Sequence, residues 1–153
     1  MKKVWAYVIS SVLSDAELDK FTAAGLNFVN HWTAHENKLN ANFEIFGKRI
    51  VLISVDEAYY GASGCSIDKL LRFIQQCEKD FNCQLLNRHN VAYEAENAIR
   101  VCPSHQIPHL LEKGEITPST LVFNTAISNS EELTRWKEPL DSTWLNKFLV
   151  KTE

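Results

Sequence analysis

Residues 59–68, "YYGASGCSID", concentrate the residue types that could do chemistry. They lie between an apolar run that ends at Val55 and an amphipathic run that begins at Ile67. A glycine-containing loop that opens a helix presents unpaired backbone N–H groups at the positive end of the helix dipole, where they suit an anion. The predicted ligand-binding residues are therefore Tyr59, Tyr60, Gly61, Ser63, Gly64, Cys65 and Ser66.

The spacing within this stretch excludes two known devices. A Walker-type phosphate loop needs G-x-x-x-x-G-K-[ST], and the stretch has neither that glycine spacing nor a lysine before Ser66. A nucleophile elbow needs G-x-S-x-G, and although Gly61 stands two residues before Ser63, Cys65 stands two residues after it. What remains is a helix start capped by Ser63 or Ser66.

Cys65 lies at this helix start, where the helix dipole would stabilise a thiolate and lower the thiol pKa from its ordinary value of about 8.5. With His31 or His35 as the base, Cys65 would be the nucleophile of a cysteine-dependent enzyme, and the helix-start N–H groups would be the oxyanion donors. The alternative is structural: the serines cap the helix and Cys65 points inward. Because helix caps are ubiquitous and nucleophiles are rare, the structural interpretation is preferred.

Two histidine-containing segments have spacings that metal ligands use. "HWTAHE" places His31 and His35 four residues apart, but the predicted helix ends between them and the order H-E-x-x-H is absent. "CPSHQIPH" places Cys102, His105 and His109 at C-x₂-H-x₃-H without an identifiable fourth ligand. We therefore predict no metal site and no cofactor, and these three residues are the candidates if a metal were bound.

Other polar and aromatic residues are secondary candidates. Asp56 and Glu57 end the strand before the loop and are interpreted as solvated carboxylates rather than general bases. The loop of about nine residues is longer than the usual two to six, and longer loops more often carry function. Aromatic side chains that could line a ligand pocket, although most tryptophans belong to cores, are Trp5, Tyr59, Tyr60, Trp136 and Trp144.

The composition limits the classes of function. The chain has 153 residues, 23% charged and 45% hydrophobic, which is typical of one globular domain. Its net charge is −3 and its lysines and arginines are scattered, so we expect no nucleic-acid partner. No apolar run reaches the roughly 20 residues of a membrane span, and no signal-peptide cleavage site follows the N-terminus. We expect a cytoplasmic protein with free thiols and without a membrane span, and the ligand and oligomeric state stay open.

Apolar periodicity predicts the elements that position these residues. Residues 4–9 form a strand, and Ser14 with Glu17 makes a capping box that begins a helix ending near residue 33. Alternation over residues 39–45, a turn at Gly47 and an apolar run predict a hairpin before a second amphipathic helix.

The order β-α-β-β-α matches a split βαβ unit, and "VAYEAENAIRV" predicts two further short strands around Glu96 and Asn97. We therefore predict one α+β domain with a ferredoxin-like β-α-β-β-α(-β) core over about residues 1–102. The C-terminal extension, about residues 103–153, would add a strand and a terminal helix packed on this core. That helix would dock through Trp144, Leu145, Phe148 and Leu149.

The segments "NHWTAHENKLNANFEIFGKRIVLISVDE", "ASGCSID" and "KGEITPSTLVFN" resemble a group of small bacterial proteins labelled "ABC transporter ATPase", over most of the chain. The residues exclude ATPase activity, because Walker A and "LSGGQ" motifs are absent and the chain is too short for an ABC nucleotide-binding domain. The group has no established catalytic residues. The resemblance therefore implies a single domain and assigns no site.

Residues 109–124, "HLLEKGEITPSTLVFN", are similar to the helix-then-strand part of GYF-like domains, which bind proline-rich peptides. The resemblance implies a peptide groove, although the "GPY" or "GPF" that opens such modules is missing. The sequence as a whole predicts a non-enzymatic domain that binds a small ligand, an anion or a protein partner at the 56–66 loop. A cysteine-dependent enzyme is the alternative.

Overall fold

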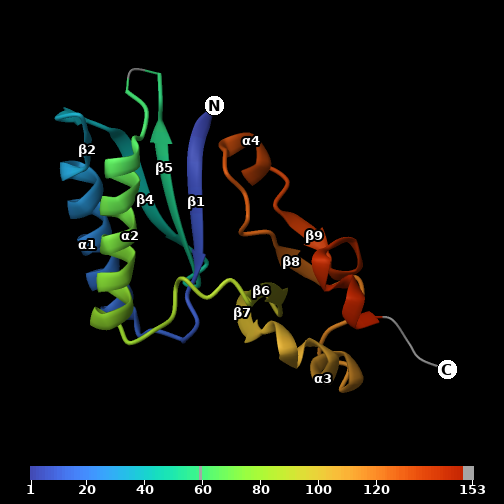
Figure 1. The fold of residues 1–153 in the computed structure, drawn as a ribbon. Helices are drawn as coiled ribbons and strands as arrows, with labels where there is room; N and C mark the ends of the chain where they lie inside the picture. Colours follow the sequence, from blue (N-terminus) through green and yellow to red (C-terminus); the bar gives the residue numbers. More distant parts are fainter. Residues whose placement is uncertain (59, 150–153) are drawn as a thin grey trace.

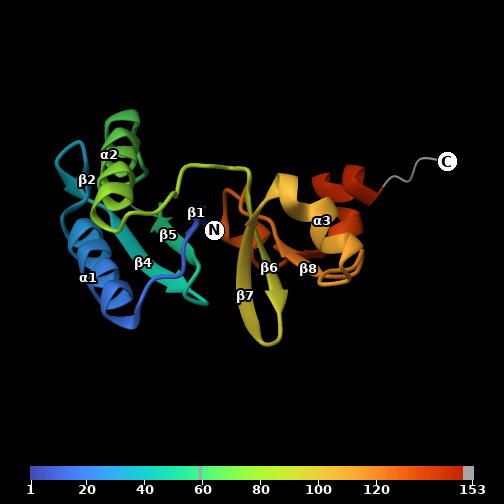
Figure 2. The ribbon, with the colours of Figure 1, turned by 90° about the horizontal axis from the view of Figure 1, so that it is seen from below.

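Helices and antiparallel sheets are stacked in layers in the computed structural model, which describes residues 1–58 and 60–149. Helices α1 (Asp15–His31) and α2 (Gly64–Asp80) cover one face of a first sheet, and a second sheet lies beyond its other face (Figure 1 and Figure 2). Helix α3 (Ile107–Glu112) lies on the far side of the second sheet. The predicted α+β class is confirmed.

The first sheet has the strand order β1-β5-β4, and both pairs are antiparallel. Its strands are β1 (Lys2–Val8), β4 (Asn40–Phe46) and β5 (Ile50–Asp56). The continuous apolar run of β5 places it in the centre, where almost every side chain is buried. A short ribbon of β2 (Thr33–Ala34) and β3 (Asn37–Lys38) connects α1 to this sheet.

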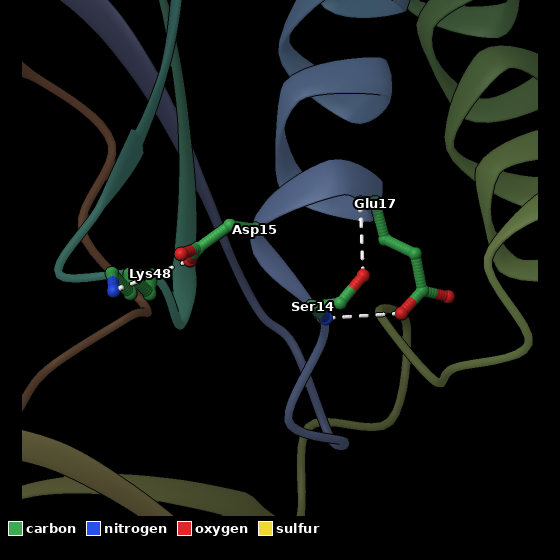
Figure 3. A network of polar contacts seen from close by, with 4 residues as sticks. All are labelled: Ser14, Asp15, Glu17 and Lys48. Atoms are coloured by element: carbon green, nitrogen blue, oxygen red, sulfur yellow. Dashed lines mark hydrogen bonds and ion pairs between the residues drawn. The ribbon is translucent and has the colours of Figure 1, made fainter.

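The predicted capping box begins α1. The backbone N–H of Glu17 donates to Ser14 Oγ at 3.1 Å, and the N–H of Ser14 donates to the Glu17 carboxylate at 3.0 Å (Figure 3). Lys48, from the β4–β5 turn, lies 3.4 Å from the Asp15 carboxylate, and both side chains are mostly exposed. Because exposed ion pairs contribute at most about 1 kcal/mol, the cap is the main determinant of this helix start.

The strand after α2 does not complete a ferredoxin-like unit in the first sheet. It begins a second, antiparallel sheet of order β7-β6-β8-β9, whose strands are β6 (Asn90–Ala95), β7 (Ala98–Pro103), β8 (Leu121–Phe123) and β9 (Lys137–Pro139). At the outer edge of β1, the backbone bonds to residues outside the first sheet: the Val4 N–H donates to Ser128 O, and Arg88 donates to Ala6 O. The division between the sheets therefore falls in the 81–89 connection, earlier than the predicted core boundary near residue 102.

Of two predictions for the second half of the chain, one is confirmed and the other is wrong. The predicted hairpin is confirmed, and Glu96 and Asn97 turn with φ angles of 52° and 65°. The expected terminal helix is instead a pair of 3₁₀ turns, Leu140–Ser142 and Trp144–Leu149. Leu145 is buried there as predicted, and Phe148 and Leu149 pack against the same cluster, whereas Trp144 is 52% exposed and lies outside that cluster.

The two sheets share an apolar core. Val4, Ala6, Ile50 and Leu52 of the first sheet pack in one cluster with Ala92, Phe123 and Trp136 of the second half. A separate cluster lies under α1 and α2, and another lies under α3. Because the middle cluster draws on both sheets, neither sheet buries its apolar face without the other.

Candidate functional site

The loop between β5 and α2 uses its own polar groups to begin the helix. Ser63 is the N-cap: its Oγ accepts from the Ser66 N–H at 3.2 Å, and Ser66 Oγ accepts from the Ser63 N–H at 2.7 Å. Ser66 is fully buried, and its carbonyl accepts from Nε1 of the buried Trp32 at 2.8 Å. The predicted cap is confirmed, and Trp32 ties it to the core.

The carboxylates of this region also bond within the loop. Asp56 Oδ1 accepts from the Ala58 N–H at 3.1 Å, and Glu57 Oε2 accepts from the Ala62 N–H at 2.8 Å. The Glu57 carboxylate thus lies next to the positive end of α2, where an external anion would bind. An added anion would therefore experience repulsion from Glu57.

The remaining ligand-binding candidates of the loop are mostly solvent-facing. Tyr60 is 48% exposed, and Gly61 and Gly64 are exposed as well. A Cβ at Gly61 would lie 3.0 Å from Glu57 Oε2, whereas a Cβ at Gly64 would meet nothing within 4 Å. Tyr59 lies outside the described residues. The cavities described below lie elsewhere, so the loop does not form the wall of any of them.

Cys65 is exposed on the first turn of α2, which differs from the inward position of the structural interpretation. In the part of the chain that the structure describes, no hydrogen bond joins Cys65 to a histidine. His31 Nδ1 lies 2.9 Å from the Asn27 carbonyl, and His35 follows the end of α1 in a left-handed turn with φ of 51°. A thiol nucleophile needs a base within hydrogen-bond reach, and these residues do not supply it here.

The other cysteines are buried free thiols. Burial raises the pKa of Cys77 to about 12 and the pKa values of Cys83 and Cys102 to about 11. Thiols of this kind are protonated at neutral pH and therefore inert.

The candidate metal ligands do not come together. Cys102 is buried while His105 and His109 are exposed, and the described residues hold no group of three or more histidine, cysteine or acidic side chains placed to bind a metal.

A hollow of about 870 Å³ lies between the β4–β5 turn and the β6–β7 hairpin. Its walls are formed by the two turns, including Gly47, Lys48, Glu96 and Asn97, and by the edges of Phe46 and Ile99. These turn residues are exposed, and no buried polar side chain is among the lining residues. The hollow therefore has no buried polar group that could orient a ligand, and the Glu94 carboxylate in its wall is already paired with Lys137 at 2.8 Å.

A more enclosed cavity, about 470 Å³, lies where the second sheet meets β1. Strands β6 and β8 pair at a single position, Tyr93 with Val122, and Val91 and Asn124 beyond that pair line the cavity. Its aromatic walls are Trp5 and Trp144. Its apolar lining is completed by Ala6, Val91, Val122, Phe123, Ala126 and Ile127.

Fixed polar side chains also line this cavity. Arg88 Nη1 donates to Ala6 O at 2.7 Å, and the Arg88 guanidinium lies 5.1 Å from the centre of the Tyr7 ring. Asn90 is 7% exposed, and its Nδ2 donates to Gln84 Oε1 at 3.1 Å. Other polar lining residues are Asn124, Thr125, Glu138, Ser142 and Thr143. An apolar cavity with a few oriented polar groups has the composition of a ligand site.

Sequence reasoning found part of this cavity. Trp5 and Trp144 were among the predicted pocket-lining aromatics, whereas Trp136 belongs to the core between the sheets. It missed Arg88 and Asn90, which lie in and just after the irregular 81–89 connection. No local pattern marks these two residues, because the cavity forms only when the second sheet packs beside β1.

Comparisons of the chain with family models, with curated proteins and with solved structures found no match. Among the described residues, the helices are too short or too polar to cross a bilayer.

Proposed function

We propose that this protein is a non-enzymatic binding module and that the cavity beside β1 holds its ligand or a segment of its protein partner. The observation that carries the proposal is the combination of two tryptophan walls with polar side chains that are already held in place. The cavity volume of about 470 Å³ falls within the range of roughly 300–1,000 Å³ that is typical of small-molecule sites.

The hydroxyl groups of the cavity support binding rather than catalysis. Ser142 Oγ donates to the Asp141 carboxylate at 3.4 Å, which is long for a hydrogen bond, and Thr143 Oγ1 donates to the Leu140 carbonyl at 2.7 Å. No histidine, cysteine or lysine is among the residues that line the cavity. None of the lining hydroxyl groups is therefore hydrogen-bonded to a histidine or a lysine of the lining, the arrangement that commonly activates a serine or threonine nucleophile.

The local resemblance of residues 109–124 to GYF-like domains supports a peptide as the ligand. The end of this segment, Val122 to Asn124, contributes to the cavity wall. Aromatic walls suit the rings of proline and the side chains of extended peptides. A proline-rich segment is therefore one of the ligands to be tested.

The alternative function is a cysteine-dependent enzyme with Cys65 as the nucleophile. Its support is the exposure of Cys65 on the first turn of a 17-residue helix, whereas Cys77, Cys83 and Cys102 are buried. Titration of Cys65 alkylation against pH separates the two functions. A thiolate pKa well below that of free cysteine supports the enzyme, and a pKa near about 8.5 supports the binding module.

The test of the binding function uses the four tryptophans as reporters. The protein is labelled with ¹⁵N and titrated with a proline-rich decapeptide, with short peptides that have free carboxylates, and with inorganic phosphate. We expect the indole signals of Trp5 and Trp144 to shift more than those of the buried Trp32 and Trp136, whose rings only contact lining residues. Shifts confined to backbone signals of the 57–66 loop would instead make that loop the site, and the cavity proposal would be wrong.

A further inference from the structure

Arg88 is fixed in the cavity wall, and its charge is not compensated by an acidic side chain. The hydrogen bond to Ala6 O and the Tyr7 ring hold the guanidinium in one place. Within residues 1–58 and 60–149, the ion pairs involve other cations, and none includes Arg88. A guanidinium held in this way offers a planar fork of N–H donors, which is the geometry that recognises a carboxylate.

Asn90 supplies a hydrogen-bond acceptor close to Arg88. Its Nδ2 is used by Gln84, but its Oδ1 accepts no hydrogen bond from the described residues. Among those residues, no fully enclosed side-chain nitrogen or oxygen lacks a partner, so this oxygen is open to solvent although Asn90 is 7% exposed. Because Asn90 lines the cavity, a ligand with an N–H group can satisfy the oxygen there.

Arg88 and Asn90 are two positions apart in the chain and line the same cavity, so one small ligand can contact both. Residues two apart have Cα atoms separated by at most about 7 Å. A carboxylate and an amide N–H that share one carbon atom lie a few ångströms apart, as they do in an amino acid with an acylated nitrogen. Such a unit presents its carboxylate and its N–H together to Arg88 and Asn90, and its side chain to the apolar walls.

We infer that the cavity recognises an N-acylated amino acid unit, with the carboxylate on Arg88, the amide N–H on Asn90 and the side chain against Trp5 and Trp144. This inference rests on the proposed function and specifies the ligand class. Such a unit occurs as a free small molecule and as the C-terminal residue of a peptide. Glu138 also lines the cavity, and its negative charge favours one carboxylate over a dianion such as phosphate.

The first experiment compares two probes on the unaltered protein. N-Acetylphenylalanine carries the carboxylate, and N-acetylphenylalaninamide replaces it with a neutral group of nearly the same shape. We expect both to shift the Trp5 and Trp144 indole signals, with the acid binding about tenfold or more tightly, since hydrogen bonds to charged groups are the stronger ones. Inorganic phosphate at the same concentration is expected to shift these signals less than the acid.

The second experiment removes the guanidinium. Arg88→Gln is expected to abolish the preference for the acid over the amide. Arg100→Gln is the matched control, because Arg100 is exposed on β7, pairs with Glu96 at 3.5 Å and lies away from this cavity. If loss of the bond to Ala6 prevents Arg88→Gln from folding, the comparison of acid and amide on the unaltered protein still decides the inference.

The third experiment distinguishes the two sources of the ligand. A hexapeptide that ends in phenylalanine is tested as the free acid and as the C-terminal amide. Tighter binding of the hexapeptide acid than of N-acetylphenylalanine identifies a peptide C-terminus, and exclusion of the hexapeptide with retained binding of N-acetylphenylalanine identifies a free small molecule.

Different experimental results would overturn the inference and the proposed function. Equal affinities of acid and amide, with shifts at Trp5 and Trp144, would overturn the inference and leave the cavity as a binding site. Absence of shifts at both tryptophans with all of these probes and with the proline-rich peptide would overturn both. An acid preference that survives Arg88→Gln would also overturn the assignment of the carboxylate to Arg88.

Discussion

The loop before α2 and the cavity beside β1 both contain polar groups near aromatic side chains, but they use their hydrogen bonds differently. In the loop, Ser63 and Ser66 bond to each other, and Glu57 bonds to the backbone of the same loop. In the cavity, Arg88 and Asn90 each make one side-chain hydrogen bond and keep further donors or an acceptor unused. The loop therefore stabilises a helix, whereas the cavity retains capacity for a ligand.

This difference has a physical origin in where the polar residues lie in the chain. The loop residues are neighbours in the chain, so their small polar side chains reach each other's backbone groups without help from the rest of the fold. The cavity residues come from separate segments, and their polar groups cannot all satisfy one another. Unsatisfied capacity in a preformed cavity is a better indicator of binding than a concentration of serine, glycine and cysteine.

The largest expected effect concerns the side chain that joins the loop to the core. Trp32 is fully buried and donates to Ser66 O, so Trp32→Ala should lower the free energy of unfolding by about 3–5 kcal/mol. Urea unfolding followed by circular dichroism measures the loss. A loss below about 1 kcal/mol would show that the loop is not held by the core, and the contrast with the cavity would disappear.

The second effect is a pH dependence that separates Cys65 from the buried thiols. Burial raises the pKa values of Cys77, Cys83 and Cys102 in the folded protein. The unfolded chain therefore loses protons first as pH rises, and stability falls above pH about 8.5, by an amount on the order of 2 kcal/mol between pH 7 and pH 9. Urea midpoints at these pH values measure the fall.

One observation controls this pH experiment. At pH 8, iodoacetamide should modify the exposed Cys65 in the native protein, while the buried thiols should react only after unfolding, as mass spectrometry of peptides can establish. A midpoint that is equally high at pH 9 and pH 7 would contradict the raised pKa values.

A smaller effect tests the cap itself. Ser66→Ala removes the acceptor of the Ser63 N–H, and we expect a loss of about 1–2 kcal/mol in the free energy of unfolding. Gly64→Ala is the matched control, because a Cβ there meets nothing within 4 Å and should change stability by less than about 0.5 kcal/mol. Neither substitution should change the affinity for N-acetylphenylalanine. Weakened binding in Ser66→Ala at full folding would show that the loop takes part in the site.

The smallest expected effect on stability belongs to the cavity. Trp144 is 52% exposed, so Trp144→Ala should change the free energy of unfolding by less than about 0.5 kcal/mol. The same substitution removes a wall of the cavity and should weaken binding of N-acetylphenylalanine, as measured by the shift of the Trp5 indole signal. A large loss of stability with unchanged binding would show that Trp144 stabilises the fold and takes no part in the binding site.

The sequence predicted the features that depend on neighbouring residues. The capping box of Ser14 with Glu17, the cap by Ser63 or Ser66, and the hairpin around Glu96 and Asn97 follow from hydrogen bonds and periodicity within a few positions. The end of α1 between His31 and His35 was predicted for the same reason. The exposed position of Cys65 was not predicted, because its first-turn location allows either orientation until the helix packs.

The sequence by itself thus determined the α+β class and the helix cap at Ser63, since the bonds of a cap form between residues that are close in the chain. Tertiary structure alone decided that β6 leaves the first sheet and that Arg88 and Asn90 face the same cavity as Trp5 and Trp144. The physical reason is that this cavity exists only because two sheets pack around a shared apolar core. The residues on its walls are up to 139 positions apart, from Trp5 to Trp144, and no local pattern records such a contact.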